Sequence, residues 1–447
     1  MSDQPEVRAR VRRDYVPVDD YSPEFHALEV ERVWPRTWQV ACRLQEIPEV
    51  GDYVNYEIAS ESILVVRSAP DRVRAFYNVC PHRGRRLRDD ARGNLSAIFC
   101  GYHAWTFDLD GKVTTIPDRE DWHGCPASSD EDFSLTGVRA ETWAGWVWIC
   151  MDPAAPSLME YLGPIPGRLD RYEWDKCSIR SHQTIIFPVN WKVAIEAFVE
   201  PYHVIATHPQ LLRWGHGRAA PTAEYLHSGF RHAGHYGSRN YDFTAPESEF
   251  RDVREYLYTS AHNTYHDLRG LYHEEGLRAA ERVRDEGPEG MDMGQAFQMF
   301  WDLRREEILK SGADYPEGIL PEDCAIIEWL FFPNSSVLTS VEGAFWYRAR
   351  PNGDDPNSCI FQVIVLGRYG PGKEPDFAYE FYPTLESFKG QNAILEQDFS
   401  NMVAVHKGMR SRGFKGARPN PEQESQVANF HRVLHGYIHG NDDWATG

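Results

Sequence analysis

Two short cysteine–histidine pairs are the residues in this sequence whose types and spacing point most directly to chemistry. Cys80 and His82 lie in C-P-H-R-G, and Cys100 and His103 follow in C-G-Y-H-A-W. Thiolate and imidazole ligands together suit either an iron–sulfur centre or zinc. Both pairs also have neighbours that favour tight ligand loops: Pro81, Gly84 and Gly101.

A structural zinc site with two cysteines and two histidines is the competing interpretation. Common zinc patterns separate the ligands of a pair by about two to five residues, and the single residue between Cys80 and His82 fits them poorly. Colour separates the two hypotheses, because an iron–sulfur cluster absorbs visible light and zinc does not.

A second candidate metal site lies in the segment Y-H-V-I-A-T-H-P. We expect a helix from Trp191 to His203, and on a continuous helix His203 and His208 would point in different directions. One of them should therefore lie just past a helix end, as Pro209 also suggests. Two histidines with one carboxylate form the facial triad of mononuclear non-haem iron oxygenases. The pair alone is a weak signal, because the chain has 18 histidines.

Taken together, the two patterns resemble a known family. C-x-H-x17-C-x2-H, followed about a hundred residues later by E-x-Y-H-x4-H, is similar to the large (alpha) catalytic subunit of Rieske non-haem iron, or aromatic-ring-hydroxylating, oxygenases. The resemblance implies that Cys80 and Cys100 hold one iron of a [2Fe–2S] cluster, while His82 and His103 hold the other. It also implies that His203 and His208 bind a mononuclear Fe(II).

The resemblance implies two further site residues. The family's third iron ligand is an aspartate on a late helix, which Asp398 matches, with His406 where glutamine is usual. Glu396 is a nearby competitor, but two residues away on a helix it should point elsewhere. Glu200 stands where the family has an acidic residue that connects the iron site to a Rieske histidine of a neighbouring subunit. The alternatives are a solvated helix carboxylate for Asp398 and a surface charge for Glu200.

The implied function is that of a terminal oxygenase. It uses O2 and electrons, ultimately from NAD(P)H through a separate ferredoxin or reductase, to hydroxylate, dihydroxylate or demethylate an aromatic or other apolar small molecule. The implied assembly is a head-to-tail homotrimer, with or without a small beta subunit. Two other functions stay open: a Rieske electron carrier without oxygenase activity, and a lipid- or sterol-binding protein with a zinc module.

The elements that must position these residues form an α+β pattern. A helical segment over 1–39 should pack with the catalytic domain. An all-β Rieske domain should follow over 40–155, and a helix-grip catalytic domain with an antiparallel sheet over 156–447. We expect a hairpin turn at Asp108–Gly111, a strand over Ser178–Phe187 and a long helix over Leu385–Arg412.

Composition limits the partners and the compartment. The net charge is −20, which argues against nucleic acid and anionic membranes. There is no apolar run of about 18 residues, and the six cysteines outside the two pairs are scattered, as in a cytoplasmic protein. One basic cluster is either solvated loop charge or a docking patch for an acidic electron donor: Arg83, Arg85, Arg86 and Arg88.

Overall fold

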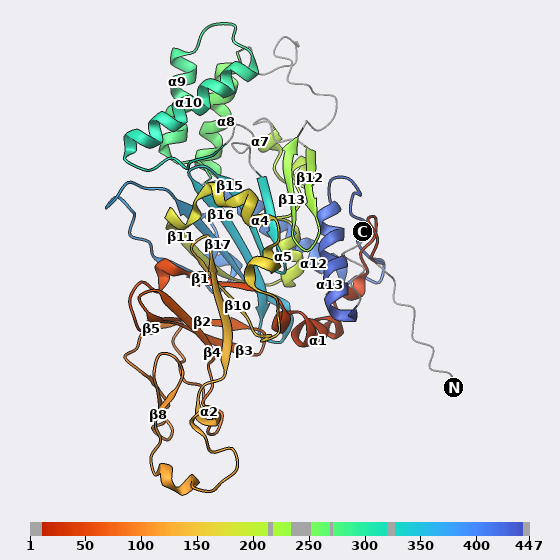
Figure 1. Cartoon of the computed structure of the whole chain (residues 1–447). Helices are drawn as coiled ribbons and strands as arrows, with labels where there is room; N and C mark the ends of the chain where they lie inside the picture. The colour runs from red at the N-terminus through yellow and green to blue at the C-terminus, as the bar shows by residue number, and fades with distance from the viewer. Residues whose placement is uncertain (1–10, 213–217, 234–251, 269–270, 320–326, 441–447) are drawn as a thin grey trace. The chain divides into compact units, whose positions relative to one another are not determined.

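The computed structural model describes residues 11–212, 218–233, 252–268, 271–319 and 327–440 (Figure 1). The chain divides into two compact units, one formed by Met1–Glu29 with Gly167–Gly447 and the other by Val30–Pro166. The sequence-based boundaries at 1–39, 40–155 and 156–447 stay a prediction about functional domains. None of the helices in the described ranges is both long enough and apolar enough to cross a membrane.

The Val30–Pro166 unit is built on antiparallel strands. A seven-stranded sheet has the order β1 (Gln39–Arg43), β10 (Trp146–Cys150), β9 (Gly137–Trp143), β4 (Arg72–Tyr77), β3 (Glu61–Ala69), β2 (Asp52–Ile58) and β5 (Arg92–Asn94). A three-stranded sheet contains β6 (Ile98–Phe99), β7 (Thr106–Phe107) and β8 (Val113–Thr115). The unit also holds the short helices α2 (Asp130–Phe133) and α3 (Leu158–Leu162). The all-β prediction is confirmed.

The hairpin predicted at Asp108–Gly111 connects β7 and β8. Gly111 has a positive φ of 84°, and its amide donates to the Asp108 carbonyl at 3.0 Å. Phe107 and Trp105 are buried in the same apolar cluster as Cys80 and Cys100. The hairpin and this buried apolar cluster therefore support the two cysteine loops.

The other unit is built on an eight-stranded sheet. Its order is β12 (Arg218–Glu224), β13 (Ser228–Ala233), β14 (Ile327–Phe331), β15 (Ser335–Ser340), β16 (Gly343–Asn352), β17 (Asp355–Gly367), β11 (Ser178–Phe187) and β18 (Tyr379–Tyr382). All pairings are antiparallel except the one between β11 and β18. The predicted α+β catalytic domain with an antiparallel sheet is confirmed, and the strand predicted over Ser178–Phe187 has the same bounds as β11.

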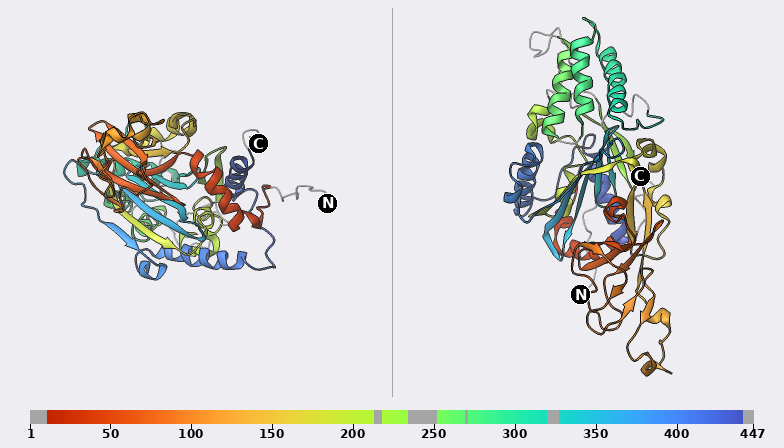
Figure 2. Two further views of the ribbon diagram at one scale, coloured as in Figure 1. Left: turned by 90° about the horizontal axis from the view of Figure 1, so that it is seen from below. Right: turned by 90° about the vertical axis from the view of Figure 1, so that its left-hand side faces the viewer.

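Helix α5 (Trp191–Glu196) packs on β16 and β17, and helix α12 (Ala393–Met409) carries the candidate iron ligand Asp398. Phe399 of α12 packs on Phe187 of β11 and Phe361 of β17, with ring centroids 4.8 and 5.5 Å apart. A separate group of three helices runs side by side in Figures 1 and 2: α8 (Val253–Asp267), α9 (Glu274–Glu286) and α10 (Met293–Ser311). The remaining helices are α1 (Pro23–Arg32), α4 (Ile165–Leu169), α6 (Val204–Thr207), α7 (Pro209–Leu212), α11 (Leu385–Phe388) and α13 (Ser425–His439).

Two helices are shorter than the sequence pattern predicts. The helix expected to reach His203 ends at Glu196, ahead of Pro201, which has no backbone N–H for helical bonding. The helix expected over Leu385–Arg412 is interrupted after Phe388 by Gly390, which has a φ of 85°. It restarts as α12, where the Asn392 side chain accepts from the Leu395 amide.

Candidate metal centres

The two cysteine loops have the same backbone design. The amide of Gly84 donates to the carbonyl of Cys80 at 3.0 Å, and the amide of Ala104 donates to the carbonyl of Cys100 at 3.1 Å. The residue four positions after each cysteine has a positive φ angle, 74° at Gly84 and 61° at Ala104. The loop role predicted for Gly84 is confirmed. In the second loop the left-handed position falls on Ala104 and not on Gly101, which lies in the turn directly after Cys100.

The side chains of these loops fit a [2Fe–2S] cluster. Cys80 and Cys100 are buried, and burial followed by interaction with the Cys100 thiol raises the pKa of Cys80 to about 11. His82 and His103 lie with ring centroids 4.5 Å apart. The Nδ1 atom of His82 is buried and has no hydrogen-bond partner within the ranges described. A buried ring nitrogen without a partner is costly unless it binds a metal. The loops therefore place the two thiols beside each other and the two imidazoles beside each other, and their binding of one cluster stays a prediction.

Trp105 packs against the histidine side of this centre. Its ring stacks on His82 at a centroid distance of 4.8 Å and an interplanar angle of 2°. Trp105 in turn contacts Trp122 and Phe133 at 5.9 and 5.3 Å. The packed rings keep water from one side of the loops, which influences the potential of a bound cluster.

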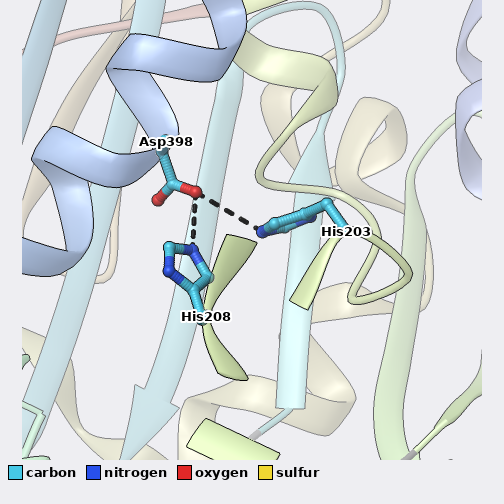
Figure 3. Close-up of side chains that lie close together, drawn as sticks. All are labelled: His203, His208 and Asp398. Atoms are coloured by element: carbon cyan, nitrogen blue, oxygen red, sulfur yellow. Dashed lines mark hydrogen bonds and ion pairs between the residues drawn. The ribbon is translucent and has the colours of Figure 1, made fainter. Parts of the chain in front are cut away.

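A second candidate centre joins His203 and His208 to Asp398 (Figure 3). One ligand atom of each lies within 4.8 Å of the other two. Asp398 Oδ1 is 2.6 Å from His208 Nε2 and 3.5 Å from His203 Nε2. Ligands on one face of a six-coordinate iron are separated by about 3 Å, so these three residues fit a single Fe(II). The three side chains would occupy one face of such an ion and would leave its other positions for other ligands.

The backbone explains why the two histidines converge. His203 is the N-cap of α6 and His208 is its C-cap, so the short helix places one histidine at each end. The expectation that one histidine lies past a helix end is confirmed. Asp398 comes from α12 and is 5% exposed, whereas Glu396 accepts from the amide of Gly390 at 2.7 Å. Asp398 therefore joins the histidines and Glu396 does not.

Two side chains fix the orientation of the imidazoles. Glu200 Oε1 is 2.7 Å from His203 Nδ1, and its other oxygen accepts from the His203 amide at 3.0 Å. Gln397 Oε1 is 2.7 Å from His208 Nδ1. Because both partners are acceptors, each histidine carries its proton on Nδ1 and presents Nε2 to the iron position. Gln397 was missed by the sequence interpretation, because nothing in its position next to Asp398 shows that it contacts His208.

The iron position is strongly acidic. Burial opposes protonation of His203, but Glu200 and Asp398 together raise its pKa to about 9. Burial, with Glu200 and Asp398, raises the pKa of Glu328 on β14 well above its ordinary range. Burial and then Glu200 raise the pKa of Glu424 to about 7. A divalent cation would offset this repulsion between carboxylates. Glu328 could have been recognised from the sequence, because it is the single carboxylate in the apolar stretch I-I-E-W-L-F-F and is therefore expected to be buried.

Family comparisons cover both units. Residues 168–440 match the family described as ring hydroxylating alpha subunit (catalytic domain), and residues 37–127 match the Rieske [2Fe-2S] domain. The catalytic match exceeds half of the chain and sets aside the electron-carrier and zinc-module interpretations.

Individual relatives agree with this assignment. The glycine betaine monooxygenase oxygenase subunit of Pseudomonas aeruginosa is 29% identical over 189 residues, 42% of each chain. The large oxygenase component of the naphthalene 1,2-dioxygenase system of Pseudomonas fluorescens is 32% identical over 197 residues, 43% of this chain and 44% of that one. These alignments span less than half the length of the curated relatives.

A solved structure of a quaternary ammonium Rieske monooxygenase has the same fold. It aligns with a TM-score of 0.65 and 18% identity over 96% of both chains. The chain therefore belongs to the Rieske non-haem iron oxygenases as a large, alpha-type catalytic subunit, a family whose members carry a [2Fe–2S] cluster and a mononuclear iron and receive electrons from a partner reductase.

Proposed function

We propose that this protein is the terminal oxygenase of a multicomponent system, with the catalytic iron held by His203, His208 and Asp398. The observation that carries the proposal is the convergence of these three side chains, from α6 and α12, within 4.8 Å of one another. When bound, the iron supplies O2 activation, which the protein's own side chains cannot perform. The reaction is hydroxylation, dihydroxylation or oxidative demethylation of a small molecule.

The four loop residues of the other unit are proposed as the entry point for electrons. Cys80 and Cys100 would hold one iron of the cluster, and His82 and His103 the other. A ferredoxin or reductase is the proposed donor. Within the basic cluster, Arg86 is engaged by Glu57 and lies 3.7 Å from Asp89, so its charge is partly offset. Docking of an acidic donor at this cluster stays a prediction.

Glu200 is proposed to link the two kinds of centre. It holds the Nδ1 proton of His203 and is only 7% exposed. In a head-to-tail homotrimer, the same carboxylate would meet a cluster histidine of the neighbouring subunit. Its role in this chain is to orient His203 and to connect it to that neighbour by hydrogen bonds.

Metal analysis of the loaded protein tests this function. The wild type should contain about three iron atoms per chain. His203→Ala should contain about two, keep the visible spectrum of the cluster and lose product formation with a chemical or protein electron donor. His123→Ala, at an exposed histidine, is the matched control and should behave like the wild type. Full product formation by His203→Ala would refute the proposed iron site.

A further inference from the structure

A second functional feature is a cavity of about 470 Å³ in the unit that carries the iron ligands. Its floor is formed by Phe345 of β16 and by Val363 and Val365 of β17, and α8 contributes Tyr265 and His266. Small-molecule sites typically have volumes of about 300–1,000 Å³, an apolar lining and a few polar groups. The polar groups of this wall are Arg180, Ser181, Gln183, Glu380, Gln391 and Asn392.

Arg180 reaches the cavity because of a β-bulge. On β11, Ile179 pairs with Leu366 and Ser181 pairs with the next residue, Val365, so Arg180 is an extra residue without a partner on β17. In a regular strand, Arg180 and Ser181 would point to opposite faces. Here both line the same cavity. Bulges re-aim side chains in this way beside functional sites.

The Arg180 guanidinium is available to a ligand. Its charge acts on the neighbouring His273 and Tyr369, but across the described ranges no hydrogen bond or ion pair joins it to another side chain. The acidic residue of the cavity wall, Glu380, instead accepts from Gln183 Nε2 at 2.6 Å and from the Tyr382 hydroxyl at 2.9 Å. A guanidinium with free donors binds a carboxylate through two parallel hydrogen bonds. The nearby Glu380 disfavours a doubly charged ligand, so a carboxylate fits better than a phosphate.

The cavity lies on the sheet face that also supports the iron site. Phe345 pairs with Val365, and Tyr347, two residues further along β16, pairs with Val363, so all four side chains share one face. Phe361 continues this face on β17 and contacts Phe399, the neighbour of Asp398. Asn392, in the cavity wall, caps the helix that carries Asp398, and six residues of helix rise about 9 Å.

We propose that Arg180 is a specificity-determining residue, which anchors the carboxylate of an organic-acid substrate whose far end extends toward the iron position. This inference rests on the proposed function. It identifies the substrate class as a small monocarboxylic acid whose oxidised group lies at the end of the molecule far from the acid group. Arg180 takes no part in the oxidation itself.

Calorimetric binding of a matched acid and amide tests the anchor. The probes are hydrocinnamate and its neutral primary amide, with holoprotein whose folding is checked by thermal unfolding. The wild type should bind the acid at least tenfold more tightly than the amide. Arg180→Gln should abolish that preference, Arg180→Lys should keep part of it, and the exposed Arg412→Gln should change nothing. Equal binding of acid and amide by the wild type, or unchanged acid binding by Arg180→Gln, would overturn the proposal.

Two further measurements complete the test. Val365→Phe, which fills the cavity and keeps Arg180, should weaken both probes, and unchanged binding would place them elsewhere. With Co(II) at the iron position and Zn(II) as the diamagnetic control, NMR should show stronger broadening of the phenyl protons than of the protons beside the carboxylate. The reverse order would refute the orientation. Failure of the protein to take up Co(II) would instead contradict the proposed iron site, and it would leave the binding comparison intact as a test of Arg180.

Discussion

Replacing Lys192 by methionine should destabilise the catalytic unit in a strongly pH-dependent way. Lys192 and Glu29 have fully buried side chains, and Lys192 Nζ donates to Glu29 Oε1 at 2.5 Å. The indole of Trp191 donates to the other oxygen at 2.9 Å. Burial disfavours the Glu29 carboxylate, but Lys192 reverses this effect and lowers its pKa. Methionine keeps most of the packing volume of the lysine side chain and removes its positive charge.

The expected loss of folding stability follows from protonation of the Glu29 carboxylate when Lys192 is absent. The buried carboxylate would take up a proton, so its pKa in the folded state rises above the ordinary value of 4.5. At pH 7 this protonation costs about 3.4 kcal/mol, from 2.5 pH units at about 1.36 kcal/mol each. At pH 5 it costs only about 0.7 kcal/mol. A raised carboxyl pKa removes stability as the pH rises above the unfolded value, so the variant should be most impaired at neutral and alkaline pH.

Urea denaturation followed by circular dichroism at pH 5 and pH 7 measures the difference. Adding Glu29→Gln to Lys192→Met should recover most of the loss at pH 7, because no buried charge remains. The control is Lys176→Met, which removes a half-exposed partner of Glu173 and should change the stability little at either pH. A loss for Lys192→Met that is the same at both pH values would refute the reasoning, since it would show that charge burial is not its cause.

Three further outcomes are expected. Gln397→Leu should weaken metal binding about 10- to 100-fold in calorimetric titration, because His208 loses the acceptor of its Nδ1 proton, whereas Glu396→Gln should not. Burial disfavours the charged form of His431, but Asp20 and Glu196 raise its pKa to about 9; its contribution to stability is therefore complete below pH 6.5 and lost as the pH rises toward 9. Thermal unfolding of the wild type should decline over that interval more than that of His431→Gln. Ala104→Gly should raise the unfolding temperature, because it removes the strain of a left-handed alanine, which costs about 1 kcal/mol. The visible spectrum of the cluster should stay unchanged. A lower unfolding temperature would contradict the assigned loop geometry.

The sequence predicts most of what depends on short-range pattern. The strand at Ser178–Phe187 and the hairpin at Asp108–Gly111 follow from residue alternation and turn chemistry, and both are confirmed. The convergence of Asp398 on His203 and His208 was available only through family resemblance, because no local rule connects residues 190 positions apart.

Other features could not be read from the chain because they depend on tertiary contacts. Gln397 orients His208 only because α12 passes α6, and neither segment encodes that approach. The bulge that turns Arg180 into the cavity needs the register of β17 beside β11. Ala104 has a left-handed backbone because its loop has the same hydrogen bond as the loop that ends at Gly84. Residue propensity alone predicts glycine at such a position.

The placement of the two sets of ligands along the chain has a consequence for biogenesis. All four cluster residues belong to the continuous segment Val30–Pro166, whereas the iron ligands extend to Asp398. At a synthesis rate of about 5–20 residues per second, Asp398 leaves the ribosome roughly 15 to 60 s after His103. The cluster loops are thus complete while the iron site still lacks its carboxylate. Cluster insertion can begin on the nascent chain, whereas the mononuclear iron site is complete only after Asp398 has been synthesised.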